Sequence, residues 1–155
     1  MSKIKVNNIA KSFGTKEVLK GINLEVAQGE SLVIIGGSGS GKSVLLKNVL
    51  GLMSPTSGSI LVDGESVHKM SNRKRMQYMS KFGMLFQGGA LFDSIPVWKN
   101  ITFAPFFNEG MGKKEARALA ISKLEQVGLS EREAYAFPAE LSGGMQKRVA
   151  LARAI

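Results

Sequence analysis

The stretch GGSGSGKS, residues 36–43, decides the fold that this sequence predicts. It fits the pattern G-x-x-x-x-G-K-[ST], whose fixed positions here are Gly36, Gly41, Lys42 and Ser43. Glycines let a backbone wrap closely around an anion and adopt positive φ, so that consecutive N–H groups converge on it. A dense apolar run at residues 31–35 precedes the loop, and helical spacing at residues 44–50 follows it. The stretch therefore predicts a phosphate-binding loop between a strand buried on both faces and a helix.

The residue types of this loop suit a nucleoside triphosphate. Lys42 brings a mobile positive charge to the β- and γ-phosphates. Ser43 offers a hydroxyl to Mg²⁺, which prefers a few protein oxygens and several waters. The helix that starts at Gly41 points the positive end of its dipole at the same phosphates. We therefore expect the whole loop to bind the nucleotide: Gly36, Gly37, Ser38, Gly39, Ser40, Gly41, Lys42 and Ser43.

The composition excludes several kinds of site. The 155 residues include no cysteine, which excludes disulfides and zinc–thiolate sites, and one histidine, His68, which excludes any site that needs two imidazoles. No apolar run approaches the roughly 20 residues that span a bilayer, and the start, MSKIKVNNIAK, has no signal-peptide core. A cytosolic setting is therefore expected. The net charge of +9 leaves a nucleic acid, an anionic lipid surface or no specific partner open.

The periodicity of the remaining chain predicts an α/β fold. Apolar residues suit strands at residues 4–9, 18–26, 59–62 and 82–86, with turns at Phe13-Gly14 and Asp63-Gly64. One face of a later helix, which Gly128 ends, consists of Ala116, Leu119, Ala120, Leu124 and Val127. A last helix begins near Ser142 and still runs at Ile155. A strand–loop–helix unit with further strands is typical of α/β proteins.

Two further features suggest contacts with the nucleotide. LSGGM at residues 141–145 starts the last helix: Ser142 suits an N-cap, and the two glycines leave backbone N–H groups bare for a phosphate. Since this motif lies far along the chain from Lys42, we expect it to close on a nucleotide held by another copy. The amide of Gln87 follows an expected strand and could reach Mg²⁺ or an attacking water. Taken alone, LSGGM is typical of an ordinary helix cap, and Gln87 is typical of a solvated surface residue.

The glycine loop, Gln87 and LSGGM, in this order, resemble the nucleotide-binding domain of an ABC transporter. The stretches GMLFQGGALFDS (residues 83–94) and LSGGMQKRVALARAI (residues 141–155) are similar to the ATPase subunit of Mla/Mkl-type phospholipid transporters. In that group a methionine, here Met145, typically replaces the glutamine that ends the signature. The resemblance implies an α/β P-loop NTPase fold with an antiparallel β region and a helical subdomain. It also implies an ATP-binding core at about residues 1–94, a helical subdomain at about 95–141, and the signature motif with its helix at 141–155.

The resemblance implies roles for single residues as well. ATP and Mg²⁺ are the expected cofactors, with Lys42 and Gln87 as catalytic residues and with Ser43 and Gln87 as Mg²⁺ ligands. Phe13 stands where the family has an aromatic that stacks on adenine; the alternative is an aromatic of the core or of the turn. Across a dimer, the expected contacts with the nucleotide are Ser142, Gly143 and Gly144.

The implied function is that of the ATP-driven motor of a membrane lipid transporter. The expected partners are a second copy in a nucleotide-sandwich dimer, an integral membrane permease, and MCE-type and STAS-type subunits, with no nucleic acid. Such a protein lies peripherally on the cytoplasmic face of the inner membrane. The candidates for the contact with the permease, with burial in the core as the equal alternative, are Trp98, Phe103, Phe106 and Phe107.

The family continues beyond the signature helix with an acidic Walker B strand and a switch histidine. This sequence has no Asp or Glu after Glu140, and its histidine, His68, lies before Gln87 and is expected to be an isolated, exposed side chain. We therefore expect about two thirds of a nucleotide-binding domain, with the C-terminal part of the fold and the catalytic glutamate missing. A chain of this kind is expected to hydrolyse ATP negligibly and to unfold with little cooperativity.

A different class of function is that of a soluble ABC-type ATPase acting on nucleic acid or ribosomes. The net charge of +9 favours it, but the segment between Gln87 and Ser142 has no sustained heptads for the long coiled coil that DNA-repair members insert. The basic residues also lack the interleaved aromatics that stack on bases. The basic run at residues 69–81 is then a solvated face, or a contact with anionic lipid headgroups. A P-loop kinase or GTPase leaves LSGGM unexplained.

Overall fold

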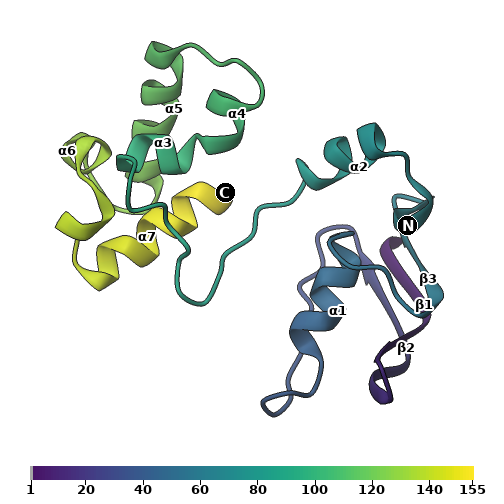
Figure 1. The fold of residues 1–155 in the computed structure, drawn as a ribbon. Helices are drawn as coiled ribbons and strands as arrows, with labels where there is room; N and C mark the ends of the chain where they lie inside the picture. Colours follow the sequence, from purple (N-terminus) through teal and green to yellow (C-terminus); the bar gives the residue numbers. More distant parts are fainter. Residues whose placement is uncertain (1) are drawn as a thin grey trace. The chain divides into compact units, whose positions relative to one another are not determined.

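The computed structural model describes residues 2–155, which fall into two compact units, Met1–Phe82 and Gly83–Ile155. The first unit holds the strands and the second holds only helices and loops (Figure 1). These units are defined by contacts within the chain. The functional division at about residues 94 and 141 remains a prediction.

The first unit is built on a four-stranded antiparallel sheet in the order β2-β1-β3-β4. Its strands are β1 (Ser2–Phe13), β2 (Lys16–Ala27), β3 (Ser57–Val62) and β4 (Glu65–Ser66). Val6 of β1 lies opposite Leu24 of β2 and Ile60 of β3, so apolar residues meet across the sheet. The strands predicted at residues 4–9, 18–26 and 59–62 are therefore confirmed.

One face of this sheet packs against helix α1 (Lys42–Val49). Leu45 and Val49 of α1 share a buried cluster with Ile9 and Ile60 of the strands, which confirms the helix predicted at residues 44–50. The turn η1 (Val67–Lys69) and helix α2 (Asn72–Met79) complete the unit. The hydroxyl of Tyr78 in α2 donates a hydrogen bond to the Val49 carbonyl, which ties α2 to α1. Burial, and then the charge of Asp63, raises the pKa of Tyr78 to about 12.

The prediction of a buried strand at residues 31–35 is wrong. This segment pairs with no strand among residues 2–155, and its Val33 and Ile35 side chains are 76% and 91% exposed. The strand predicted at residues 82–86 is wrong for the same reason: no ladder forms there within the described chain, and Leu85 and Phe86 are exposed. A strand needs a partner for its backbone N–H and C=O groups, and an apolar run does not supply one.

The expectation that His68 is an exposed, isolated side chain is also wrong. Its ring, on turn η1, is half-buried, and neither ring nitrogen is accessible or hydrogen-bonded within residues 2–155. Desolvation, and then the positive charge of Arg75, lowers the pKa of His68 below 6.5. The backbone of Asn48 lies close enough to raise this pKa slightly, although it forms no hydrogen bond with the ring. The two ring nitrogens are therefore shielded from solvent by the protein.

We expect the His68 imidazole to titrate below pH 6.5 in the folded chain and near 6.5 in urea. The side chain then contributes stability that is complete above about pH 6.5 and is lost as the pH falls through the folded-state pKa, because the unfolded chain binds the proton more tightly. NMR titration of the ring protons gives both midpoints, since the sequence contains a single histidine. A folded-state midpoint at or above 6.5 contradicts this burial.

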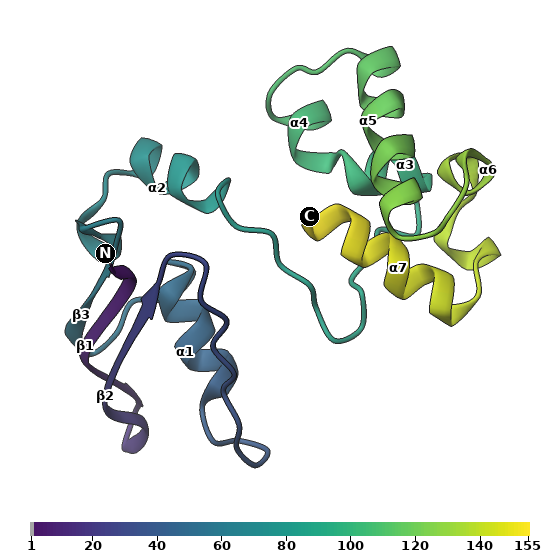
Figure 2. The same cartoon turned by 180° about the vertical axis from the view of Figure 1, so that it is seen from behind.

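The second unit is a cluster of short helices (Figure 2). They are α3 (Val97–Ile101), α4 (Phe103–Phe107), α5 (Lys113–Gln126), α6 (Glu131–Tyr135), η2 (Pro138–Glu140) and α7 (Gly143–Ala154). Ala116, Ala120 and Leu124 of α5 are fully buried against α3 and α7, and Gly128 follows the helix with a φ of 69°. The helix predicted from this apolar face is confirmed.

Two polar side chains fix the connections of this unit. The buried Asn100 amide in α3 accepts a hydrogen bond from Phe92 N (2.7 Å) and donates to the carbonyls of Phe92 (3.0 Å) and Ile95 (3.1 Å). Glu133 accepts from Ser130 N and Oγ at the start of α6, and these bonds hold the pKa of Glu133 below its usual value. The segment before α3 and the start of α6 are thereby ordered.

The aromatic residues of this unit divide between core and surface. Trp98 is 3% exposed and stacks edge-on against Phe106, so it belongs to the core and is not available as a contact surface. Phe107 is 50% exposed, and Phe103 and Phe106 are half-buried. None of the helices within residues 2–155 is both long and apolar enough to cross a membrane.

Candidate nucleotide-binding site

Two of the four glycines in the loop at residues 36–43 have the positive φ that the sequence predicts. Gly39 and Gly41 adopt φ values of 78° and 94°, in the region that side chains disfavour. A Cβ on Gly41 would lie 2.9 Å from the Leu19 side chain and 3.2 Å from the Val18 carbonyl oxygen. The end of the loop therefore lies directly on β2, at a distance that only glycine allows.

The ammonium of Lys42 lies over this loop. Its Nζ donates to the carbonyl oxygens of Gly36 (2.6 Å) and Gly37 (2.7 Å), and more weakly to Ser40 Oγ (3.4 Å). These oxygens accept the N–H groups of Lys42 that would otherwise donate to a phosphate. Phosphate binding therefore requires Lys42 to exchange neutral carbonyls for anionic oxygens, which accept stronger hydrogen bonds.

The start of α1 provides further donors for an anion. Gly41 is the N-cap and offers no side-chain acceptor, and the first turn contains no acidic residue. The first N–H groups of the helix have no partner inside the helix, and they carry the positive end of the dipole. Ser43 is exposed in this turn. A hydroxyl in this position fits Mg²⁺ that is bound together with phosphate oxygens, because Mg²⁺ needs only one or two protein oxygens.

Phe13 is the last residue of β1, and its ring is 48% exposed. The ammonium of Lys11 lies 5.3 Å from the ring centroid. The ring is therefore not part of the core. It lies a few residues before the Val18–Leu19 segment on which Gly41 packs, and stacking on adenine remains a prediction.

The LSGGM segment forms the start of α7 in the second unit. Ser142 is the N-cap, and its Oγ accepts a hydrogen bond from Met145 N (3.3 Å), as predicted. Gly143 and Gly144 are exposed, and an added Cβ at either would meet no atom within 4 Å. Both glycines are thus open to solvent, and the first N–H groups of a helix have no partner inside it. Gln146 has a structural role that the sequence did not indicate. Its Nε2 donates to the carbonyls of Pro138 (2.8 Å) and Leu141 (3.3 Å), and these bonds fix the chain that enters this helix.

Gln87 lies in a turn of the second unit, closed by a hydrogen bond from Gly89 N to Phe86 O (2.9 Å). The exposed Gln87 lines a hollow of about 250 Å³ with Leu85, Phe86, Gly89 and Lys147 of α7. The loop at residues 36–43 thus belongs to one unit, and Gln87 and the glycines of α7 belong to the other.

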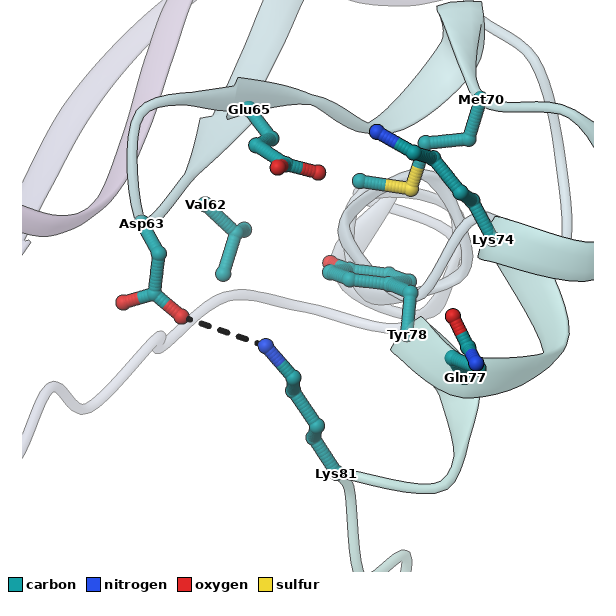
Figure 3. Close-up of a pocket in the computed structure, with 8 residues that line it drawn as sticks. All are labelled: Val62, Asp63, Glu65, Met70, Lys74, Gln77, Tyr78 and Lys81. Atoms are coloured by element: carbon teal, nitrogen blue, oxygen red, sulfur yellow. Dashed lines mark ion pairs between the residues drawn. The ribbon is translucent and has the colours of Figure 1, made fainter.

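A separate hollow of about 260 Å³ in the first unit lies between β4 and α2 (Figure 3). Asp63 on its rim forms ion pairs with Lys3 (2.8 Å) and Lys81 (3.7 Å), and these lysines, Lys3 first, lower the pKa of Asp63.

The basic run at residues 69–81 is largely exposed. Two of its methionines, Met76 and Met79, are also exposed and do not fill the core.

Comparison with known proteins identifies the family. The ABC transporter model matches residues 19–155. The glutamine transport ATP-binding protein GlnQ of Escherichia coli K12 is 45% identical over 98% of this chain and 62% of its own length. The intermembrane phospholipid transport system ATP-binding protein MlaF of Haemophilus influenzae is 40% identical over 98% of this chain and 57% of its own length.

A solved dimeric ATP-binding cassette in a post-hydrolysis state, bound to ADP and Pi, matches with a TM-score of 0.86 and 33% identity, over 98% of this chain and 68% of that one. The chain thus spans about three fifths of the length of these two curated relatives. Since their names differ in cargo at similar identity, the narrower assignment to the Mla/Mkl type is not confirmed. The chain belongs to the ABC transporter family and has the α/β P-loop fold of its ATP-binding cassette.

Proposed function

We propose that this chain binds ATP with Mg²⁺ at residues 36–43 and serves an ABC transporter that hydrolyses ATP to ADP and phosphate. The observation that carries the proposal is the position of Lys42, the first residue of α1, whose ammonium donates to the Gly36 and Gly37 carbonyls of the loop. Phosphoryl transfer needs mainly positioning and charge neutralisation. Lys42 and the dipole of α1 supply the charge, and Ser43 supplies a Mg²⁺ ligand.

The proposed working form is a dimer with the nucleotides between two copies. The exposed Gly143 and Gly144, through their N–H groups, and the cap Ser142 would contact the nucleotide of the second copy. The match to a dimeric cassette with ADP and Pi supports this arrangement. Gln87 would approach Mg²⁺ and the attacking water, and its loop would transmit the state of the site to a membrane permease.

The substitution Gly144→Val tests the dimer. It adds a side chain in open space, so the fold and the ATP affinity of the monomer are expected to stay unchanged. ATP-driven dimerisation is expected to be lost, because the side chain covers the N–H groups at the start of α7. Sedimentation with and without ATP and Mg²⁺ measures this, with Gly112→Val before α5, also in open space, as the matched control. Equal dimerisation of both variants, or none by the unsubstituted chain, contradicts the proposed interface.

For the cargo, we propose phospholipid, on the resemblance of residues 83–94 and 141–155 and on the phospholipid-transport relative. The corresponding partners are an integral permease with MCE-type and STAS-type subunits, at the cytoplasmic face of the inner membrane. The glutamine-transport relative, at 45% identity, supports amino acid transport as the second candidate. A function on nucleic acid is not favoured, because both curated relatives are transport proteins by name.

Purification of the protein, tagged and expressed from its own locus, distinguishes these proposals. Mass spectrometry of the co-purified membrane proteins is expected to identify a permease with MCE-type subunits. A permease accompanied by an amino-acid-binding subunit replaces the lipid proposal by the second candidate. Nucleic acid or ribosomal proteins in place of a permease contradict the transport function.

A further inference from the structure

The segment that carries Gln87 runs along the C-terminal half of α7. A Cβ on Gly83 would come within 1.6 Å of the Ala154 carbonyl oxygen, so the chain touches the end of the helix there. A Cβ on Gly89 would lie 3.5 Å from Ala150 Cβ, in ordinary contact. Residues 83–90 are thus held against one helix at both ends.

A guanidinium joins this segment to the helix by two hydrogen bonds. Arg153 of α7 donates from Nη1 to the Ala90 carbonyl and from Nη2 to the Gly89 carbonyl, both at 2.7 Å. Gly89 and Ala90 both have positive φ, at 75° and 48°, and for alanine this conformation is unfavourable. This backbone conformation turns both carbonyls toward one side chain. The two hydrogen bonds from Arg153 offset the conformational energy that it costs.

We propose that Arg153 is a positioning residue that holds the Gln87 turn on the signature helix, so that Gln87 and the start of α7 move as one body. The inference deepens the proposed function and rests on it. The start of α7 would contact the nucleotide of the second copy, and Gln87 would contact the Mg²⁺ and water. Closure of a dimer onto Ser142–Gly144 would then set the position of Gln87 through α7 and Arg153.

The role suits arginine and not lysine. The planar fork of a guanidinium has donors spaced to reach two successive carbonyls, whereas an ammonium is a single point. Within residues 2–155 no carboxylate forms an ion pair with Arg153. Burial of the group lowers the pKa of Arg153. Its hydrogen bonds to the Gln87 turn come from a charged donor, which makes them stronger than bonds from a neutral donor.

Amide hydrogen exchange on the protein expressed from its own locus tests the contact. Arg153→Ala is expected to speed exchange across residues 86–91 by at least about tenfold, because two charge-assisted hydrogen bonds are lost. Arg153→Lys, with one bond at most, is expected to be intermediate. The matched control is Arg148→Ala, which removes a guanidinium of the same helix that donates to the Gly128 carbonyl (2.9 Å). Added ethylguanidinium is expected to restore protection in Arg153→Ala alone.

ATP binding and turnover of the complex with its membrane partners separate this inference from the proposed function. Arg153→Ala is expected to lower kcat by at least about tenfold while the KM for ATP stays unchanged, because the loop at residues 36–43 is untouched. Unchanged exchange at residues 86–91, or an equal change in Arg148→Ala, overturns the inference. If the unsubstituted protein binds no ATP, the proposed function fails, and the exchange experiment still decides whether Arg153 holds the turn.

Discussion

Lys42→Ala is expected to abolish measurable ATP binding. The ammonium already spans the Gly36 and Gly37 carbonyls, and in the complex it would donate to anionic phosphate oxygens. Loss of a charge-assisted interaction of this kind costs about 3 kcal/mol, which is a factor of more than about 100 in Kd. Isothermal titration with ATP and Mg²⁺ measures the change.

The control for this experiment is Lys47→Ala in the last turn of the same helix. Lys47 is exposed and lies at the opposite end of α1 from the loop, so its removal changes the net charge equally without touching the site. Its Kd is expected to stay within about twofold of the unsubstituted chain, since screened charges at this distance contribute little. Equal losses for Lys42 and Lys47 indicate general attraction of an anion and contradict a specific loop.

Gly41→Ala is expected to lose both stability and ATP binding. The residue has a φ of 94°, which costs a non-glycine residue roughly 1–2 kcal/mol. Its Cβ would also lie 3.2 Å from the Val18 carbonyl oxygen and 2.9 Å from the Leu19 side chain, and the backbone oxygen cannot move away without shifting β2. Together these effects are expected to cost about 3 kcal/mol. Urea unfolding followed by circular dichroism measures the stability.

Two other glycines of the loop separate strain from contact. Gly39→Ala keeps the positive φ, at 78°, but has no atom within 4 Å of the added Cβ. Gly37→Ala has the same open space without the positive φ. The expected loss of stability therefore decreases from Gly41 to Gly39 to Gly37. A Gly41 variant as stable as the Gly37 variant contradicts the contact of the loop with β2.

The elements that were predicted correctly are those that local pattern determines. Short apolar stretches identified β1, β2 and β3, and the face containing Ala116, Ala120 and Leu124 identified α5. Ser142 was recognised as a helix cap because capping involves only the neighbouring backbone. The strand predicted at residues 31–35 depends on a distant partner, and its apolar composition could not reveal that none pairs with it in the described chain.

The candidate site follows the same division. The roles of Gly41 and Lys42 were predicted from spacing within eight residues, and their contacts with a nucleotide stay predictions. In the structure Gly41 has a φ of 94°, and Lys42 Nζ donates to the Gly36 carbonyl. Arg153 and Gln146 escaped prediction because each contacts carbonyls that the sequence does not mark. His68 was misjudged because burial of a single polar ring depends on residues distant in the sequence, here Asn48 and Arg75, and no local pattern reports that packing.

The most direct test of the nucleotide site is a titration of the ¹⁵N-labelled chain with ATP and Mg²⁺, followed by NMR. We predict saturable shifts of the backbone amides at residues 36–43, because these N–H groups would bind the phosphates. The shifts are expected to disappear in Lys42→Ala and to persist in Lys47→Ala. Amides of the loop that stay unchanged while ATP binds elsewhere, or while it does not bind at all, would contradict the nucleotide site.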